Sequence, residues 1–288
     1  WHAGLAAIKA KVPGCGCPTP KAQDRGPGAP AAIRDAAALG LFPGAVGLTQ
    51  LSNSVSIIPT TVRLIEDMTD RKLKNLLYEQ VARIGKAASS PKRLELIEVL
   101  SQGEKSVEQL AAATDISVKL ASAHLKELKS ARLVEARREG KNMVYRLVDT
   151  QVAEMWVMLR QLAEGRLLEL QAAMKEMVSH PQELAPVGGK ELLAQAKRGD
   201  VIVIDVRPET EYQTAHLPHA RSIPLAELKA RLGEIPKGKP VVAYCRGPFC
   251  LMAIEAVDLL AKKGITAVRL EDGVAEWRAR GLPLAYDL

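Results

Sequence analysis

Two short predicted helices, 106–114 and 117–133, follow one another with only Asp115 and Ile116 between them. A serine stands at the first position of each helix, where its hydroxyl suits a helix start. Two short helices joined by so tight a turn, the second of them basic, are typical of a helix-turn-helix. The pattern predicts a small helical unit that places its second helix in the major groove of DNA.

The segments around this pair complete a winged helix-turn-helix. Apolar residues from Leu73 to Ile84 recur at helical spacing, and Pro91 opens a further helix that ends before Gly103. Residues 133–148 alternate in polarity around a polar turn at 139–142, which predicts a β-hairpin. A hairpin directly after the recognition helix is a wing, so we expect an α+β unit here.

The predicted recognition helix divides into a core face and an outward face. Ile116, Ala121, Leu125 and Leu128 suit the core. The residues predicted to contact DNA lie on this helix and on the wing: Ser117, Lys119, Ser122, His124, Lys126, Arg137, Arg138 and Lys141. Serine and histidine can bond to base edges, whereas lysine and arginine suit phosphates. Any one of these side chains alone could be solvated or packed, but the whole set predicts DNA binding.

The net charge of +7 is concentrated in the same part of the chain. Residues 68–148 contain 16 Lys and Arg against 10 Asp and Glu, a net charge of +6. Residues 149–288 contain 18 against 19. A localised basic excess favours a polyanionic partner such as nucleic acid.

Residues 70–178 resemble the ArsR/SmtB-type winged-helix repressors, through the recognition helix and the run LKELKSARLVEARREGK that continues from it. The resemblance implies a homodimer that binds a palindromic double-stranded DNA operator and releases it when an inducer binds. Many members carry a cysteine-bearing metal box at the start of the third helix, where this chain has VEQLAAAT. We therefore expect no metal site and no cofactor, and an inducer that acts elsewhere.

Residues 149–178 are predicted to form one long amphipathic helix, with apolar positions from Val152 to Met177. An apolar stripe beside a small domain needs a partner. We expect a homodimer through residues 149–178, and packing against the chain's own domain is the alternative.

A second domain is expected after a linker that contains Pro181, Gly188 and Gly189. We place the boundary between residues 180 and 181, so the domains are 68–180 and 181–288. Strands are predicted at 201–205, 241–244 and 267–270, and helices at 225–232, 251–263 and 274–280. This alternation predicts an α/β domain with a mainly parallel sheet.

Two cysteines flank the loop after the predicted strand 241–244. Cys245 ends the strand and Cys250 begins the next helix, whose N–H groups and positive end favour thiolate over thiol. We expect Cys245 to take sulfane sulfur as a persulfide, with Arg246 adding positive charge beside it and Gly247 and Pro248 forming a tight loop. Cys250 is also a possible resolving thiol. The alternatives are an inert buried Cys245 and a Cys250 that only packs under the loop.

Residues 182–288 resemble the rhodanese family, through DVRPETEY, AHLPHARSIP, the CRGPFC loop and EDGVAEWRARGLP. The resemblance implies that Cys245 carries the persulfide and that Asp205, Arg207 and Glu211 brace the loop. It also implies an anion cradle formed by Arg246, Gly247, Pro248, Phe249 and Cys250. Ala215 and His219 stand where glycine is common, so we expect His219 to be a surface residue. Phosphatases with a related loop need arginine where this chain has Leu251, which disfavours phosphatase chemistry.

Residues 1–67 are rich in Ala, Gly and Pro and lack periodicity, so we expect them to be disordered. The first methionine is Met68, which leaves open that this segment precedes the native start. Cys15 and Cys17 alone are too few ligands to predict a metal site. No apolar run reaches the ~18 residues of a membrane span and no signal peptide is recognisable. We expect a cytoplasmic protein with no membrane partner.

Together these features predict a DNA-binding transcriptional regulator, expected to be a repressor, that senses or carries sulfane sulfur on Cys245. The donor would be a small molecule such as thiosulfate or polysulfide. Two other functions stay open. One is a thiosulfate or persulfide sulfurtransferase whose DNA-binding domain autoregulates it, and the other is a repressor with an inert rhodanese module used for protein contacts.

Overall fold

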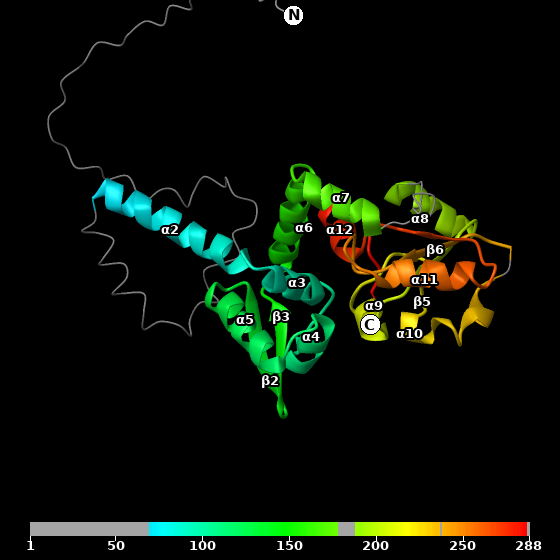
Figure 1. Cartoon of the computed structure of the whole chain (residues 1–288), viewed down its shortest axis with the longest axis horizontal. Helices are drawn as coiled ribbons and strands as arrows, with labels where there is room; N and C mark the ends of the chain where they lie inside the picture. Colours follow the sequence, from blue (N-terminus) through cyan, green and yellow to red (C-terminus); the bar gives the residue numbers. More distant parts are fainter. Residues whose placement is uncertain (1–68, 178–187, 237, 287–288) are drawn as a thin grey trace, which may run out of the picture. The chain divides into compact units, whose positions relative to one another are not determined.

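A computed structural model describes residues 69–177, 188–236 and 238–286 (Figure 1). The predictions for residues 1–67, including Cys15 and Cys17, and the domain boundary at 180/181 lie outside the described residues. We call residues 69–177 the winged half and residues 188–286 the α/β half. Both belong to one compact unit that begins at Met68.

The winged half has the predicted helices and hairpin. Its elements are α2 (Asp70–Ala88), α3 (Pro91–Leu100), β1 (Lys105–Ser106), α4 (Val107–Ala113), α5 (Val118–Ser130), β2 (Val134–Glu139), β3 (Asn142–Leu147), α6 (Thr150–Glu164) and α7 (Leu168–Met177). The antiparallel sheet has the order β1-β3-β2, with Tyr145 between Lys105 and Ala136. The short strand β1 was not predicted. It joins the wing to the start of α4, where Ser106 forms a capping box with Gln109.

The helix predicted over 149–178 is two helices, so that prediction is wrong. The helix α6 ends at Glu164 and α7 begins at Leu168, with a turn at Gly165 between them. Glycine has a low helix propensity, which explains a break there. On α6 one face is buried, including Trp156 and Val157, while Met158 and Leu162 remain exposed.

The α/β half is a parallel sheet between helices. Its elements are α8 (Gly189–Arg198), β4 (Ile202–Asp205), α9 (Glu209–Thr214), β5 (Arg221–Ser222), α10 (Leu225–Leu228), a 3-10 turn (Leu232–Glu234), β6 (Val241–Tyr244), α11 (Met252–Ala261), β7 (Ala267–Arg269) and α12 (Val274–Ala279). The strands lie in the order β5-β4-β6-β7, all parallel, as the sequence predicts. The helix predicted over 225–232 is only the short α10, followed by the 3-10 turn.

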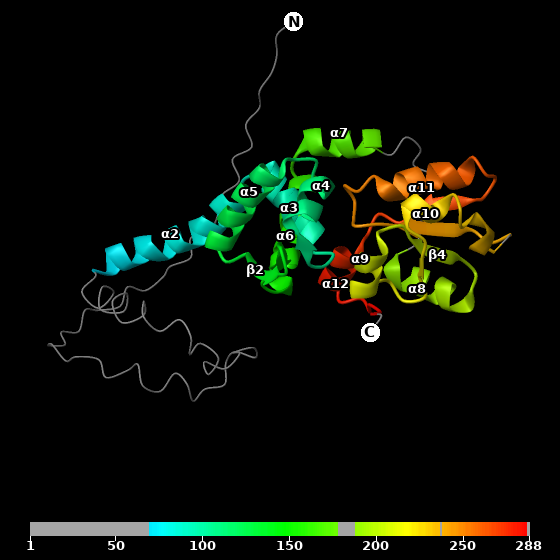
Figure 2. The ribbon, with the colours of Figure 1, turned by 90° about the horizontal axis from the view of Figure 1, so that it is seen from below.

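Side chains of β4 and β6 alternate between two apolar cores. Ile204 and Ala243 pack with α10 and α11 on one face of the sheet, and Val203 and Val242 pack with α8 and α12 on the other (Figure 2). Every residue of these two strands is buried, which is typical of central strands in a parallel sheet. Cys245 follows directly after the carboxyl end of β6, so its backbone is held by this buried sheet.

The two halves meet where α6 of the winged half lies beside α12 of the α/β half, as both views show (Figures 1 and 2). Among the described residues, no helix combines the length and apolarity needed to cross a membrane.

Candidate functional site

The surface of α5 predicted to meet DNA is on the outside of the winged half. Ala121, Leu125 and Leu128 are completely buried. The predicted DNA-facing residues Ser117, Lys119, Ser122 and Lys126 are exposed, and His124 is half-buried. Ser117 has a structural role as well, because its Oγ accepts a hydrogen bond from the Leu120 N–H and caps the helix.

The three wing cations predicted to contact DNA differ in whether a carboxylate is paired with them. Arg137 is paired with Glu104 at 2.5 Å and with Glu139 at 2.6 Å. The Arg138 Nε donates to the Gly140 carbonyl at 3.1 Å, and Lys141 is exposed in the turn. Two carboxylates thus offset the charge of Arg137, whereas in the described part of the chain neither Arg138 nor Lys141 has an acidic partner.

Cys245 and Cys250 face each other across the loop between β6 and α11. Both are free thiols; Cys245 is 1% exposed and Cys250 is half-buried. The Cys245 sulfur lies 3.6 Å from the Cys250 carbonyl oxygen and forms a hydrogen bond with the Cys250 sulfur. The Cys245 thiol is therefore placed to donate toward Cys250.

The hydrogen bond and burial shift the pKa values of the two thiols in opposite directions. The hydrogen bond from Cys245, with N–H groups of Arg246 and Met252, lowers the pKa of Cys250 from 9.0 to about 6 despite its burial. Burial, and then the neighbouring Cys250, raises the pKa of Cys245 well above 9.0. The negative charge is therefore favoured on Cys250. The sequence predicts the thiolate on Cys245, and complete burial of Cys245 at the strand end opposes its ionisation.

Backbone N–H groups surround the sulfur pair, but not all of them come from the predicted cradle. Those of Gly247 and Ala253 face Cys245, and those of Arg246 and Met252 face Cys250. Met252 and Ala253 open α11, so the helix N-terminus contributes as expected. Pro248 has another role, because its carbonyl accepts a hydrogen bond from the buried Arg269 at 2.5 Å.

The three residues expected to brace the loop differ in what they contact. Asp205 and Arg207 form a fully buried pair, joined by bonds of 2.9 and 2.5 Å at the end of β4. Glu211 contacts the loop itself, since it accepts bonds from the Arg246 Nε at 3.0 Å and Nη2 at 2.7 Å. Burial opposes its ionisation, yet these bonds hold the pKa of Glu211 below its usual value.

The winged half extends this bracing network. The Lys105 ammonium of β1 lies 2.9 Å from the carboxylate of Glu211, so Glu211 binds Lys105 and Arg246 at once. Arg207 donates to the Gln102 side-chain oxygen at 2.8 Å, just beyond α3. Two sets of buried contacts thus join the winged half to the α/β half, and the one through Glu211 reaches the cysteine loop.

Phe249, at the tip of the loop, packs into the winged half. Its ring meets Trp156 of α6 edge to face, with centroids 6.1 Å apart, and the Arg160 guanidinium lies 5.7 Å from its centroid. The Phe249 side chain belongs to the core of the winged half rather than to that of the α/β half. Movement of the loop must therefore disturb α6.

Arg160 also reaches the far side of the loop through Glu276 of α12. The two side chains meet at 3.0 Å and each is only 3% exposed. Glu276 accepts a bond from the Gly273 N–H at 2.8 Å, and a β-carbon at Gly247 would lie 3.2 Å from its carboxylate oxygens. Since Gly247 has a φ of 151°, glycine suits both the backbone and this close approach.

Glu98 of α3 completes the surroundings of the loop. Burial raises its pKa from 4.5 to about 7, and the negative charges of Cys250 and Glu276 add to this effect. Arg246 and Arg160 act in the opposite direction. Helix α3 of the winged half thus carries a buried carboxyl group whose charge is coupled to that of Cys250.

None of these contacts from the winged half was predicted from the sequence. The residues concerned are Glu98, Gln102, Lys105, Trp156 and Arg160. One signal was present: Arg160 interrupts the apolar stripe of α6 four residues after Trp156 and four before Glu164, with which it also pairs. A charged residue on a buried helical face indicates a buried partner.

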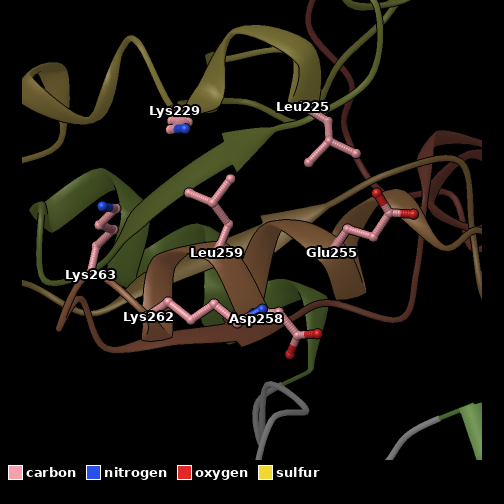
Figure 3. Close-up of a pocket in the computed structure, with 7 residues that line it drawn as sticks. All are labelled: Leu225, Lys229, Glu255, Asp258, Leu259, Lys262 and Lys263. Atoms are coloured by element: carbon pink, nitrogen blue, oxygen red, sulfur yellow. The ribbon is translucent and has the colours of Figure 1, made fainter.

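A surface cavity of about 620 Å³ lies elsewhere, between α10 and α11 (Figure 3). Leu225 and Leu259 line it, together with Glu255, Lys262 and other charged residues, and neither cysteine does. Its lysines and carboxylates largely offset each other. Within the described residues, no group of three or more His, Cys, Asp and Glu side chains is arranged to hold a metal ion.

The chain matches two protein families. One is described as "Bacterial regulatory protein, arsR family" over residues 90–136, and the other as "Rhodanese-like domain" over residues 189–280. The first match covers α4, α5 and the start of the wing, and the second covers the cysteine loop.

Some known proteins are similar to one half of the chain, and one is similar to both halves together. The HTH-type transcriptional regulator Rv0324 of Mycobacterium tuberculosis is 42% identical over 216 residues, which are 75% of this chain and 94% of that protein. A sulfurtransferase of Allochromatium vinosum is 33% identical over 86 residues, 30% of this chain and 78% of that protein. The homodimeric winged helix-turn-helix domain of Mb0332 from Mycobacterium bovis is 42% identical, over 35% of this chain and 93% of that structure, with a TM-score of 0.33.

The match to Rv0324 extends across both halves. The chain therefore belongs to the family of the HTH-type transcriptional regulator Rv0324, as a transcriptional regulator that joins an arsR-family DNA-binding domain to a rhodanese-like domain.

Proposed function

We propose that this regulator represses transcription as a homodimer and releases its operator when sulfane sulfur reacts with Cys245 and Cys250. The observation that carries the proposal is the thiol–thiolate pair, whose loop is held by Phe249 and Glu211 against the winged half. A change at the sulfurs must then act on the DNA-binding elements. The proposal places the protein in the cytoplasm with its operator.

The chemistry needs no reagent beyond the sulfur donor. The Cys250 thiolate attacks the outer sulfur of a hydropersulfide, forms a persulfide and displaces the donor's thiolate. The Cys245 thiol then attacks the inner sulfur of this persulfide. A Cys245–Cys250 disulfide forms and the outer sulfur leaves as hydrogen sulfide, so the sulfane sulfur is reduced and the two cysteine sulfurs are oxidised.

The roles of the two cysteines follow from exposure and charge. The rhodanese resemblance assigns the persulfide to Cys245, whereas the half-buried thiolate is Cys250. We propose that sulfur enters at Cys250 and that Cys245 resolves it. After reaction with one equivalent of polysulfide, mass spectrometry of Cys245→Ser should find the added sulfur on Cys250. Sulfur found on Cys245 in Cys250→Ser, with none on Cys250 in the converse variant, would assign entry to Cys245.

The homodimer is proposed through the two helices that frame the winged half. Leu77, Tyr78 and Val81 of α2 and Met158 and Leu162 of α6 are all more than half exposed. Large exposed apolar side chains that recur on a helix of a regulatory domain favour an interface. Val81→Glu should convert the dimer to a monomer in sedimentation velocity, and a Val81→Glu protein that remains dimeric would exclude α2 from the interface.

The proposed function is tested by fluorescence anisotropy with DNA from upstream of the protein's own gene, at fixed salt because affinity depends on salt. Polysulfide should weaken binding by about tenfold, equivalent to a coupling of about 1.4 kcal/mol. Cys245→Ser and Cys250→Ser should bind DNA like the unmodified protein and ignore polysulfide. Equal responses in all three proteins would refute the cysteine sensor.

A sulfurtransferase enzyme is the second candidate, favoured by the low pKa of the Cys250 thiol. Burial of Cys245 and packing of Phe249 into the winged half act against rapid turnover. Steady-state transfer from thiosulfate to a thiol acceptor separates the two candidates. Many turnovers per chain would favour the enzyme, and one sulfur per chain would favour the sensor.

A further inference from the structure

Lys105 is a residue of the winged half whose charge is buried in the α/β half. It stands in β1, which pairs with β3 of the wing, yet its ammonium group lies 2.9 Å from the carboxylate of Glu211 in α9. Lys105 is 9% exposed and Glu211 is 1% exposed. Water and salt screen so buried a pair only weakly, so the loss of either charge acts on the groups around it.

One carboxylate, that of Glu211, binds both Lys105 and Arg246. The Glu211 Oε1 lies 2.9 Å from the Lys105 Nζ and accepts a hydrogen bond from the Arg246 Nη2 at 2.7 Å, while Oε2 accepts one from the Arg246 Nε at 3.0 Å. Arg246 directly follows Cys245, and its own backbone N–H faces the Cys250 sulfur. A single carboxylate therefore separates Lys105 from the arginine of the cysteine loop.

The neighbours of Lys105 hold this part of the chain against both α9 and the wing. A β-carbon at Gly103 would lie 2.9 Å from the Thr214 Oγ1, so the backbone of residue 103 packs closely on α9. Glu104 instead pairs with Arg137 of the wing at 2.5 Å. Successive side chains of an extended segment point to opposite sides, which explains why Glu104 meets the wing and Lys105 meets α9.

The number of cations on Glu211 sets the net charge beside the loop. With Arg246 alone, the carboxylate and the guanidinium would offset each other, whereas Lys105 adds one positive charge to the set. Positive charge nearby favours a thiolate over a thiol, and Arg246 is among the groups that lower the pKa of Cys250. Cys245 and, on α3, Glu98 also act on the charge of Cys250.

We propose that Lys105 is a positioning residue for the sulfur site: it takes a share of the Glu211 carboxylate and so leaves the charge of Arg246 available to the Cys250 sulfur. The winged half thereby completes a site whose cysteines stand in the α/β half. The inference rests on the proposed function in taking Cys250 as the residue where sulfur enters. Because β1 is paired with the wing, a shift of the wing that separates Lys105 from Glu211 lowers the reactivity of Cys250.

The pH profile of Cys250 alkylation tests this role. Iodoacetamide reacts with the thiolate, so rates measured on the full chain from about pH 5 to 9, with site-resolved mass spectrometry, give the midpoint at which half of the Cys250 thiol is ionised. In Lys105→Met this midpoint should rise by about half a pH unit, and the rate well below it should fall about threefold, because a nearby positive charge is lost. An unchanged midpoint would overturn the inference.

Two further substitutions of Lys105 distinguish its charge from its packing. Lys105→Gln keeps a hydrogen-bond donor for Glu211 but removes the charge, so it should raise the midpoint as Lys105→Met does. Lys105→Arg keeps the charge and should restore the midpoint of the unmodified protein. A midpoint that follows the size of the side chain at this position rather than its charge would contradict the proposal.

Two comparisons separate action through Glu211 from general effects. In a Glu211→Gln background, adding Lys105→Met should change the midpoint much less, because the shared carboxylate is gone. Lys92→Met removes a lysine that lies 2.9 Å from Glu95 within the winged half, and it should leave the midpoint unchanged. Glu98 is present in all these proteins and affects them alike. An equal rise in both backgrounds, or a matching rise in Lys92→Met, would refute the role of Lys105.

The inference and the proposed function can fail separately. If polysulfide leaves DNA binding unchanged but Lys105→Met raises the midpoint, the regulatory function is wrong and the role of Lys105 stands. If DNA release needs both cysteines but the midpoint is the same in Lys105→Met and in the unmodified protein, the role of Lys105 is wrong and the sensor stands.

Discussion

Arg160 of α6 and Glu276 of α12 form a salt bridge of 3.0 Å in which each side chain is only 3% exposed. The Arg160 Nε has no hydrogen-bond partner among the described residues. The ion pairs of Arg160 with Glu276 and Glu164 therefore compensate its positive charge. Burying two charges costs solvation free energy, and loss of one partner leaves the other uncompensated. Loss of either side chain should therefore destabilise the contact between the two halves.

We predict that Glu276→Gln and Arg160→Met each lower the free energy of unfolding by about 3–5 kcal/mol. The double variant should lose less than the sum, because neither charge is then left alone. Urea denaturation measures all three. Arg198→Met, which removes the exposed pair with Asp200, is the control and should cost under about 1 kcal/mol. Additive losses at Arg160 and Glu276 would show that they are not coupled.

The raised pKa of Glu98 predicts that stability falls as the pH rises. Its pKa is about 7 in the folded protein against 4.5 for the usual carboxyl group. Between these values the folded chain holds a proton that the unfolded chain has released, so stability falls as pH rises through this window. Glu98→Gln should match the unmodified protein near pH 4.5 and exceed it at pH 8 by up to about 3 kcal/mol.

Urea denaturation at several pH values measures this difference, with Glu95→Gln as the control on the same helix. The control should differ from the unmodified protein by a constant amount. A Glu98→Gln difference that is also constant from pH 4.5 to pH 8 would mean that Glu98 ionises normally.

Local patterns made the elements predictable. The parallel strands β4 and β6 are continuous apolar runs, and the core face of α5 follows from Ala121, Leu125 and Leu128 at helical spacing. His219 is exposed with a φ of 66°, which fits a position where glycine is common. The break at Gly165 was missed because the apolar spacing continues on both sides of it.

Contacts between the halves were not predictable, because they join residues far apart in the chain. Lys105 meets Glu211 and Arg160 meets Glu276, and no periodicity relates either pair. The charge of the cysteines depends on the same long-range burial. A helix N-terminus favours a thiolate in general, but only the packing of β6 shows that Cys245 is enclosed, which raises its pKa and favours the charge on Cys250.

Ion pairing in the wing predicts unequal roles for its arginines. Arg138→Ala and Lys141→Ala should each weaken DNA binding and reduce the slope of log affinity against log salt by about 1. Arg137→Ala should have a smaller effect, because DNA must first displace Glu104 and Glu139. Anisotropy titrations over a salt series measure both quantities. A larger loss at Arg137 than at Arg138 would mean that DNA releases Arg137 from its carboxylates.

Adding a single methyl group at Gly273 should disturb the cysteine site strongly. A β-carbon there would lie 2.3 Å from the Arg246 carbonyl oxygen and 2.8 Å from that of Cys245, both backbone atoms that cannot rotate away. Gly273→Ala must therefore displace the loop, at a cost of about 1–3 kcal/mol.

The displaced Cys250 loses the hydrogen bonds that stabilise its thiolate. Its alkylation by iodoacetamide at pH 6.5, followed by site-resolved mass spectrometry, should slow by at least about tenfold. Gly85→Ala, in α2 with no atom within 4 Å of the added carbon, should leave that rate unchanged and stabilise the helix by about 0.5–1 kcal/mol. An unchanged rate in Gly273→Ala would show that the close packing of Gly273 against the loop does not set the reactivity of Cys250.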